Sequence, residues 1–336
     1  MYEQFFGLDR HPFSITPDPG VLFLTAQHRE ALTGLTYAIL GRKGFVVLTG
    51  DAGTGKTTLL SRVLQYLPAQ RIRSSVILNS TLSPAEFLEM AMLDFGLTDI
   101  PQSKAQRIHI LQQFLLSGDA AGQISALVVD EAHKLSREVL EEIRLLGNFE
   151  NANNKLIQIL LIGQNELTDV LNREDLRQFK QRIAVRLKLE ALSRADVAQY
   201  IQHRWTKGGG SRPAPFPAAV VEQIAGHSQG IPRLINAICD NALLLAFAKG
   251  QSTVAAEHVL EAAGDLDLIR EAAVETAPEA SNEVGEETVM AAAAPDPAPA
   301  PRPAATPRFK MLERYGSDPQ PKASLWARWF GKLGLA

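Results

Sequence analysis

Eight residues near the start of the chain have the types and spacing of a phosphate-binding loop. The run Gly50-Asp51-Ala52-Gly53-Thr54-Gly55-Lys56-Thr57 fits the pattern G-x-x-x-x-G-K-[ST]. Its glycines let successive backbone N–H groups turn inward around phosphate oxygens, and Lys56 would reach the β- and γ-phosphates. The Thr57 hydroxyl would hold Mg²⁺, and the helix that continues through Thr58 would add its positive end. The loop predicts a protein that binds ATP with Mg²⁺.

Two carboxylates, roughly 70 residues further on, supply the second half of this chemistry. Asp130 and Glu131 directly follow the apolar run Ala126-Leu127-Val128-Val129. Asp130 is expected to hold Mg²⁺ through water, and Glu131 to orient and deprotonate an attacking water. Phosphoryl transfer mostly needs positioning and charge neutralisation, so this pair with Lys56 and Mg²⁺ would suffice for ATP hydrolysis. Without the loop, the same pair would indicate only surface carboxylates at a strand end.

The elements around these residues predict an α/β fold. The loop follows an apolar strand, Phe45–Thr49, and leads into a helical pattern, Thr58–Leu64. Short apolar runs alternate with amphipathic helices along the next 120 or so residues, which predicts right-handed βαβ units and a parallel sheet. The further strands are expected at Ser75–Asn79, Ala126–Glu131, Leu156–Ile162 and Ile183–Leu189. Helices are expected to start near Thr25, at the capping box Ser83–Glu86 and at Lys104.

Changes in pattern divide the chain into five predicted regions. An N-terminal extension (1–44) precedes the nucleotide-binding α/β domain (45–192), and an all-helical domain (193–264) follows. Its helices are expected after Ser193 and over Ala218–Ala225, Pro232–Ala248 and Ala255–Ala263. Residues 265–323 are acidic and then rich in Ala and Pro, which predicts a disordered linker. An amphipathic segment (324–336) ends the chain.

Composition limits the class of protein. A hydrophobic fraction of 46%, a charged fraction of 21% and a net charge of −3 are typical of a soluble globular protein that is not basic overall. Cys239 is the sole cysteine, so no intramolecular disulfide can form, and a buried thiol in a reducing compartment is expected. There is no signal-peptide pattern and no apolar run of about 18 residues, so a cytoplasmic location is expected.

The seven histidines lack metal-ligand spacing, so surface or capping roles are expected for them. His133 completes the sequence Asp-Glu-Ala-His, which also occurs in helicases, but the remaining helicase motifs are not evident. We therefore assign no function to any histidine from the sequence.

The order of these motifs resembles that of AAA+ ATPases. In that family a polar residue after the fourth strand senses the γ-phosphate, and Gln164 matches its position. Arg233, in Gly230-Ile231-Pro232-Arg233, matches the arginine of the helical lid. Arg182, in preference to Arg177, matches the arginine that reaches a neighbouring subunit's nucleotide, which implies a homo-oligomer. Asn79 matches a polar switch residue that contacts the catalytic glutamate.

The residues alone leave other roles open at three of these positions. Gln164 could cap its strand, and Pro232-Arg233 could simply begin a helix. Arg182 could belong to a solvated charged face that also carries Lys180, Arg186 and Lys188.

Residues 1–265 resemble a narrower group, the ExeA/GspA-type ATPases of general secretion and of related exopolysaccharide loci. The resemblance rests on Tyr2-Glu3-x-Phe5-Phe6-Gly7-Leu8, Pro12-Phe13, Thr16–Pro19, Leu22–Leu24, His28–Leu32, Leu161–Gln164 and Gln181–Ile183. It implies an ATPase that drives or regulates assembly of a cell-envelope export system, with inner-membrane export proteins as partners. Secretion members continue into a transmembrane helix and a peptidoglycan-binding domain. This sequence shows neither, which argues against a role in peptidoglycan binding.

The terminal segment places Trp326, Trp329, Phe330 and Leu333 on one helical face, opposite Arg328 and Lys332. This pattern could give weak contact with the surface of the inner membrane, could dock on a partner protein, or could be a disordered tail. A peripheral position at the inner membrane would follow from the first of these.

Two other functions remain open. A DNA-binding ATPase of the transposition-helper type would use basic residues such as Arg177, Lys180, Arg186 and Lys188. The near-neutral charge, the acidic linker and the N-terminal resemblance make nucleic acid the weaker prediction. The third function is a nucleotide-gated scaffold that binds ATP but hardly hydrolyses it, and the presence of Glu131 argues against it.

Overall fold

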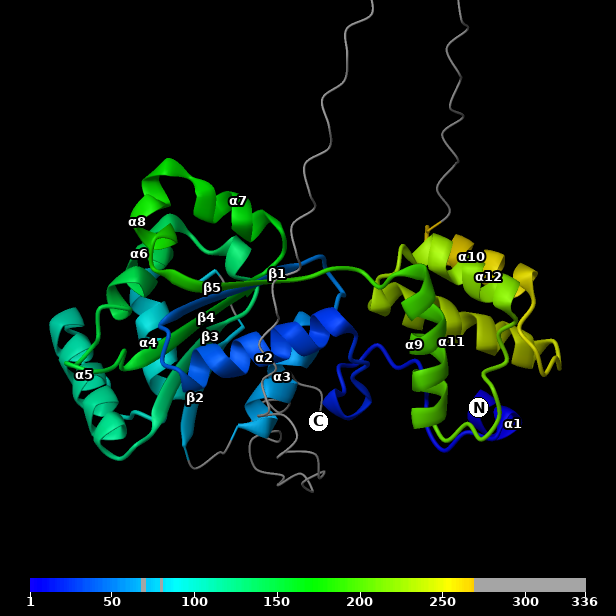
Figure 1. Cartoon of the computed structure of the whole chain (residues 1–336), viewed down its shortest axis with the longest axis horizontal. Helices are drawn as coiled ribbons and strands as arrows, with labels where there is room; N and C mark the ends of the chain where they lie inside the picture. The colour runs from blue at the N-terminus through cyan, green and yellow to red at the C-terminus, as the bar shows by residue number, and fades with distance from the viewer. Residues whose placement is uncertain (68–70, 79–80, 269–336) are drawn as a thin grey trace, which may run out of the picture. The chain divides into compact units, whose positions relative to one another are not determined.

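The computed structural model describes residues 1–67, 71–78 and 81–268 and contains a parallel sheet of five strands (Figure 1). The strand order is β2-β3-β4-β1-β5, and every neighbouring pair is parallel. The strands are β1 (Phe45–Gly50), β2 (Ile72–Ile77), β3 (Ile124–Val129), β4 (Ile157–Gly163) and β5 (Ile183–Leu189). The predicted α/β class with a parallel sheet is confirmed. Chain segments that carry chemistry leave the carboxyl ends of β1, β3 and β4, so the sheet gathers them at one edge.

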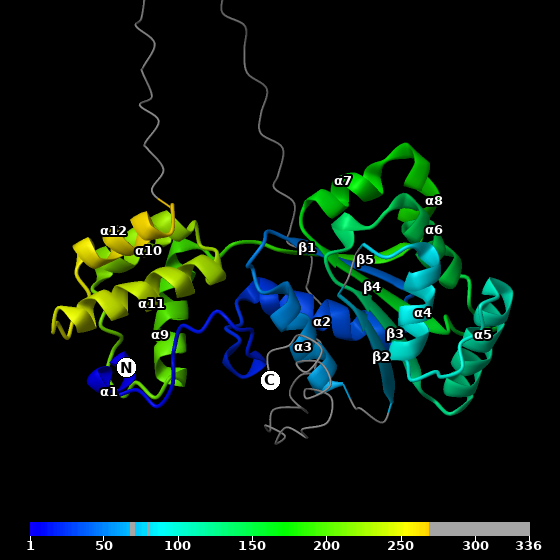
Figure 2. The same ribbon diagram turned by 180° about the vertical axis from the view of Figure 1, so that it is seen from behind.

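Helices cover both faces of the sheet (Figure 2). Successive residues of a strand point to opposite faces, so Val46 and Leu48 of β1 pack against α2 and α3, whereas Phe45 and Val47 pack against α4 to α8. This double burial explains why the strands are nearly continuous apolar runs. The first layer is α2 (Ala26–Leu40) and α3 (Lys56–Tyr66). The second layer is α4 (Pro84–Asp94), α5 (Lys104–Ala120), α6 (Arg137–Leu146), α7 (Glu166–Asn172) and α8 (Arg177–Lys180).

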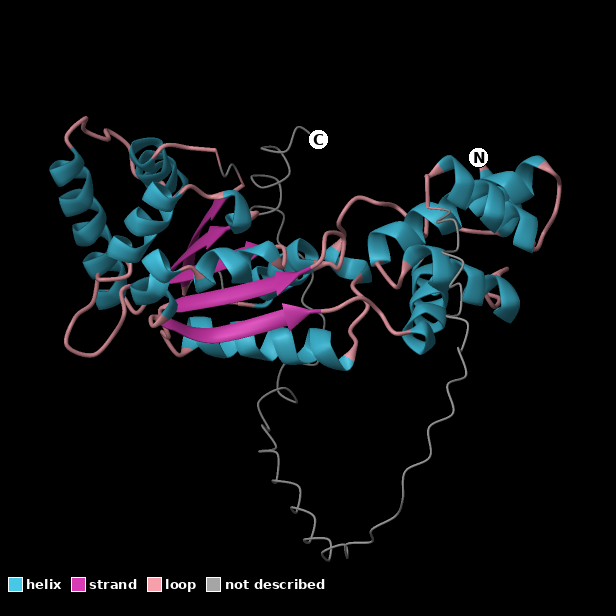
Figure 3. Cartoon of the chain, turned by 90° about the horizontal axis from the view of Figure 1, so that it is seen from above, coloured by secondary structure: helices cyan, strands magenta, loops and turns pink. Residues whose placement is uncertain are grey.

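Four helices with their own core follow the sheet (Figure 3). Ile201, Ile224, Cys239 and Val259, one from each helix, are essentially buried in it. The Ser193 side chain accepts the Asp196 N–H and so begins the first helix, as the capping pattern predicts. The helices are α9 (Arg194–Lys207), α10 (Ala218–Ser228), α11 (Pro232–Ala248) and α12 (Ala256–Asp265).

The first residues of the chain pack into the core of this helical part. Tyr2 of α1 (Tyr2–Phe6), Leu8 and Phe13 belong to the same hydrophobic cluster as α9 to α12. Arg204, only 7% exposed, donates to the carbonyl oxygens of Pro12 and Ser14 at 2.6 and 2.9 Å. The predicted N-terminal extension (1–44) therefore packs in two places. Its first residues pack in the core of the helical part, and α2 packs against the sheet. The described residues form one compact unit, and the five-region division remains a prediction.

The largest differences from the predicted strand bounds are in β2 and β3. The predicted strand Ser75–Asn79 is β2, which begins three residues earlier at Ile72, because pairing with β3 extends into a polar stretch that carries no apolar signal. The predicted strand Ala126–Glu131 is β3, which ends at Val129. Glu131 has φ +52°, a left-handed conformation that no strand residue adopts.

Short 3-10 helices connect several elements: η1 (Pro19–Val21), η2 (Ala132–Lys134) and η3 (Glu174–Leu176). Asn79 lies outside the described residues, as do most of the predicted linker and the whole terminal segment with Trp326, Trp329 and Phe330. Within the described part of the chain, none of the helices has the length and apolarity required to cross a membrane.

Phe13 tests whether the N-terminal residues are part of the folded unit. Its ring is fully buried and meets the Phe216 ring edge-on, with centroids 5.8 Å apart. Phe13→Ala should lower the free energy of unfolding by about 3–5 kcal/mol, because it leaves a cavity. Phe5→Ala is the matched control, since Phe5 is 44% exposed and should lose about 1 kcal/mol or less. Urea unfolding measures both, and equal losses would contradict the packing described above.

Candidate nucleotide-binding site

The glycine-rich loop joins the carboxyl end of β1 to the first turn of α3. Gly53 and Gly55 have φ of +81° and +94°, which side-chain-bearing residues rarely adopt. These angles turn the backbone so that α3 begins at Lys56 with its amino end toward the loop. A loop of this shape, at a helix amino end, is suited to binding an anion.

Lys56 lies beneath the loop. Its Nζ donates to the carbonyl oxygens of Gly50 at 2.7 Å and Asp51 at 2.9 Å, and the side chain is 6% exposed. Burial lowers the pKa of Lys56, and the nearby carboxylates of Asp130, Glu131 and Asp51 oppose that shift. The ammonium group is therefore held next to the position that phosphates would occupy.

Thr57 and Asp130 meet although 73 positions separate them. The Thr57 hydroxyl donates to Asp130 Oδ2 at 2.9 Å. Burial raises the pKa of Asp130, and the hydrogen bonds that its carboxylate accepts from Thr57 and from the Glu131 N–H oppose the shift. A hydroxyl oxygen beside a carboxylate oxygen is a donor set that suits Mg²⁺ completed by water and phosphate oxygens. The residues fit the predicted metal, which Thr57 and Asp130 would hold.

Glu131 directly follows Asp130 and is more accessible. Its side chain is 38% exposed, against 6% for Asp130. Its Oε2 lies 3.2 Å from Lys134 Nζ and 3.7 Å from His133 Nε2. Two neighbouring carboxylates thus have different surroundings, one buried against Thr57 and the other facing solvent beside basic side chains.

The carboxyl end of β4 lies between the loop that follows β1 and the carboxylates that follow β3, because β4 is the strand between β1 and β3. Gln164, which immediately follows β4, donates its backbone N–H to His133 Nδ1 at 3.4 Å. Asn165 donates its side-chain amide to the Asp51 carboxylate in the loop. Sequence reasoning missed Asn165 and left His133 without a function. Asn165 is adjacent to the predicted Gln164, and the Asp-Glu-Ala-His run was the available signal for His133.

Arg233 approaches the loop from the helical part of the chain. Its backbone N–H donates to the Gly53 carbonyl at 3.3 Å. A Cβ placed on Gly53 would lie 2.8 Å from Arg233 Cβ and 3.0 Å from Ile231 Cγ2, so the two segments are in direct contact. The Arg233 side chain is exposed, and its guanidinium has no hydrogen bond or ion pair within the described part of the chain.

Arg182 lies at the amino ends of the strands, whereas the loop lies at their carboxyl ends. It precedes β5, and β5 pairs with β1 in parallel from Ile183 beside Phe45 to Leu189 beside Gly50. Six residues of strand put it about 20 Å from the loop of its own chain. Its guanidinium donates to the Arg144 carbonyl at 3.0 Å and to the Asn148 side chain. The structure therefore does not bring Arg182 together with the other predicted site residues.

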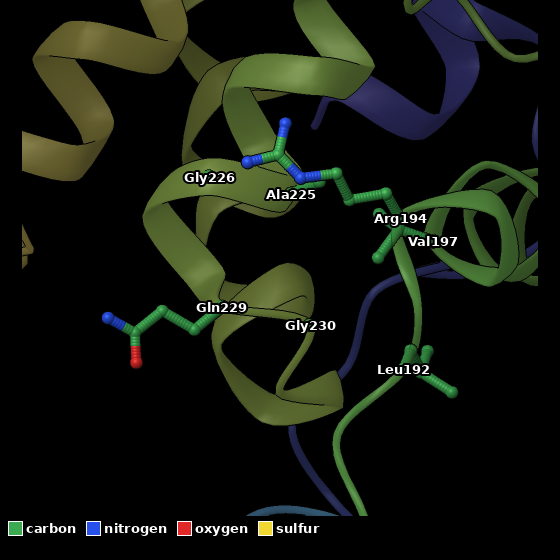
Figure 4. A pocket seen from close by; sticks show the side chains of 7 residues that line it. All are labelled: Leu192, Arg194, Val197, Ala225, Gly226, Gln229 and Gly230. Atoms are coloured by element: carbon green, nitrogen blue, oxygen red, sulfur yellow. The ribbon is translucent and has the colours of Figure 1, made fainter. Parts of the chain in front are cut away.

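A separate pocket lies beside the segment that leads from β5 into α9 (Figure 4). Leu192, Val197, Ala225 and Gly230 are among its lining residues, and the Leu192 N–H donates to the Gly230 carbonyl at 2.8 Å. The Arg194 side chain extends over Ala225, whereas the Gln229 side chain points away (Figure 4). None of the predicted site residues lines this pocket, but Gly230 immediately precedes Ile231, which contacts the loop.

Comparison with known proteins agrees with this geometry. Residues 39–171 match the family model described as an AAA domain. General secretion pathway protein A of Aeromonas hydrophila is 42% identical over 275 residues. The chain has an AAA+ fold and resembles general secretion pathway protein A. The aligned region covers 81% of this chain but 49% of that protein, so the chain spans about half the length of this relative.

Two further similarities bear on the fold and on a second function. The ATP-dependent target DNA activator B of Escherichia phage Mu is 26% identical over 266 residues, which cover 77% of each chain. The solved structure of the Aeropyrum pernix ORC2 protein superimposes with a TM-score of 0.59 at 18% identity, covering 76% of this chain and 72% of that one. At that identity the solved structure supports the fold alone.

Gly53 tests the contact between the loop and the Arg233 segment. In Gly53→Ala the new Cβ would meet Ile231 and Arg233, so affinity for a non-hydrolysable ATP analogue should fall on the order of 10–100-fold. Gly96→Ala is the matched control, because Gly96 has φ +92° but no atom within 4 Å of an added Cβ. It carries the same backbone strain and should bind like wild type. Equal binding by all three proteins in calorimetric titration would contradict the loop geometry.

Proposed function

We propose that this protein binds ATP with Mg²⁺ at the loop and hydrolyses it. The observation that carries the proposal is the Thr57–Asp130 hydrogen bond of 2.9 Å, formed beside the buried Lys56 and directly before the accessible Glu131. A strand-end Asp-Glu pair without this contact would indicate only surface charge. Placed against a glycine-rich loop, it combines a metal-binding pair with a candidate base.

Each side chain has a distinct part in the proposed reaction. The loop N–H groups and Lys56 bind the phosphates, while Thr57 and Asp130 hold the metal. Mg²⁺, when bound, neutralises charge on the phosphate oxygens. Glu131 orients a water molecule and accepts its proton, since a solvent-facing carboxylate next to the metal pair can reach an incoming water.

The remaining predicted residues would sense or complete the nucleotide. Gln164 follows the strand between the loop and Asp130, so it is suited to respond to the γ-phosphate. The unpaired Arg233 guanidinium is available to a nucleotide that occupies the loop. Arg182, far from its own loop, is proposed to act on the nucleotide of a neighbouring subunit in a homo-oligomer.

We further propose that nucleotide state controls a cell-envelope export system, of secretion or exopolysaccharide type. The support is the 42% identity to a protein named for the general secretion pathway. The Gly53–Arg233 contact gives a physical route, because a change in the loop would move the start of α11. Inner-membrane export proteins are the proposed partners. A cytoplasmic position, peripheral at the inner membrane, is proposed for the protein.

A DNA-binding ATPase is the second candidate, and the similarity to the phage Mu activator over 77% of both chains favours it. Arg186 and Lys188 lie on the exposed side of the edge strand β5, where DNA phosphates could approach them. The lower identity makes this function secondary.

Glu131→Gln tests the proposed base. Removing the carboxylate should lower the steady-state rate of ATP hydrolysis on the order of 10²–10⁴-fold while ATP affinity stays near wild type. Glu141→Gln is the matched control, because Glu141 pairs with Arg144 on the surface of α6 and should leave the rate unchanged. Phosphate release measures both variants. A full rate in Glu131→Gln would exclude Glu131 as the base.

Stimulation of the ATPase rate separates the two candidate functions. Anionic liposomes should raise the wild-type rate several-fold, and a chain truncated after Pro307 should lose that response, because charge and apolar area in the terminal segment would provide the contact. Double-stranded DNA should have no effect. Stimulation by DNA that persists in the truncated chain would favour the DNA-binding function and contradict the export proposal.

A further inference from the structure

The phosphate loop needs hydrogen-bond donors for its carbonyl groups. The Thr54 N–H and hydroxyl donate to the Asp51 carbonyl from within the loop. An unpaired buried carbonyl is costly, so the other buried carbonyls must find a donor elsewhere. Lys56 serves Gly50 and Asp51, and the Arg233 N–H serves Gly53. Thr54 is 1% exposed, so its carbonyl also requires a partner inside the protein.

His28 of α2 is the side chain placed to be that partner. Its side chain is 3% exposed, in contrast to the surface role expected from sequence, and the Thr54 backbone raises the pKa of the ring, as a carbonyl that accepts from it would. The ring Nε2 lies 3.9 Å from the position that a Cβ on Gly55 would occupy, so Nε2 is the atom that faces the loop. Thus a residue 26 positions before Thr54 lies against the loop.

The neighbours of the two ring nitrogens bear on which nitrogen carries the proton. Thr25 is the N-cap of α2, and its hydroxyl oxygen accepts the His28 backbone N–H at 3.3 Å. The same hydroxyl lies 2.7 Å from His28 Nδ1. A backbone carbonyl can only accept, so a neutral ring that faces the Thr54 carbonyl through Nε2 must carry its proton there, and the Thr25 hydroxyl then donates to Nδ1. Nδ1 is then the acceptor, and Nε2 carries the proton that is donated to the Thr54 carbonyl.

We propose that His28 is a positioning residue of the nucleotide site, holding the phosphate loop in shape from its outer side as the neutral Nε2–H tautomer. The proposal rests on the proposed function, since a loop held in this way matters only if it binds nucleotide. Burial lowers the pKa of His28, which is consistent with a neutral ring, although the Thr54 hydrogen bond and Asp196 act in the opposite direction. The N-terminal extension thereby contributes directly to nucleotide affinity.

The tautomer can be measured without nucleotide. Long-range ¹H–¹⁵N correlation spectra of the full chain, labelled with ¹⁵N-histidine, distinguish the two neutral tautomers and the imidazolium. The signal missing from a His28→Gln sample assigns His28. The Nε2–H pattern at pH 7.5 is expected. An Nδ1–H pattern or an imidazolium would overturn the proposal, whether or not the protein binds ATP.

Substitutions test the effect on the loop. His28→Asn is too short to reach Thr54, so it should weaken binding of a non-hydrolysable ATP analogue about tenfold and raise deuterium uptake in the loop peptide. His28→Gln can still place an amide donor near the former position of Nε2. It should therefore keep most of the affinity for the analogue and most of the protection of the loop peptide from deuterium uptake. His11→Asn, at a histidine that is 58% exposed, is the control and should match wild type.

The outcomes separate this inference from the proposed function. Wild-type affinity and wild-type uptake in His28→Asn would overturn the role of His28. Should wild type itself fail to bind nucleotide, the proposed function fails, and loop uptake together with the tautomer still decides the role of His28. If His28→Asn does not fold, two measurements still decide the role of His28. One is the comparison of His28→Gln with wild type, and the other is the tautomer seen in the wild-type spectra.

Discussion

The backbone of the phosphate loop places a constraint on much of the surrounding structure. Buried carbonyl groups that the loop does not pair within itself must be satisfied by donors from other segments. Lys56 at the start of α3 and the Arg233 N–H at the start of α11 donate to loop carbonyls, and His28 in α2 is the proposed third donor. The elements that carry them are accordingly packed onto one loop.

Charge burial is the second requirement of the site. Lys56 and Asp130 are each 6% exposed, and burial shifts both toward their neutral forms. Each is partly compensated, Lys56 by neighbouring carboxylates and Asp130 by hydrogen bonds from Thr57 and the Glu131 N–H. Such groups are stable in a protein only when they are held by partners, which makes their positions well defined. The doubly covered sheet provides the rigid frame for them.

Local patterns were sufficient to predict the parallel sheet and the loop between β1 and α3, and they placed Asp130 and Glu131 directly after β3. Ile183–Leu189 and Pro232–Ala248 match β5 and α11, because apolar periodicity and a proline at the first helical position are local signals. The start of β2 was missed, since its pairing with β3 involves polar residues. The contacts of Asn165 with Asp51 and of His28 with Thr54 join segments distant in sequence, and no local pattern reports such contacts.

The predicted boundary of the N-terminal extension also depends on contacts between segments that are distant in sequence. An extension before the first strand was visible in the sequence, but its division between the helical core and the sheet depends on tertiary packing of Phe13 and α2. The resemblance to secretion ATPases was visible from short motifs and is confirmed by the 42% identity.

Equilibrium binding of ATP to the full chain tests the central claim most directly. Calorimetric titration should be made with wild type and with Lys56→Ala, each with Mg²⁺ and with a chelator. One ATP per chain should bind wild type, tightly only when Mg²⁺ is present, and binding should be lost in Lys56→Ala. Binding that is indifferent to both Mg²⁺ and Lys56 would contradict the assignment of the nucleotide to this loop.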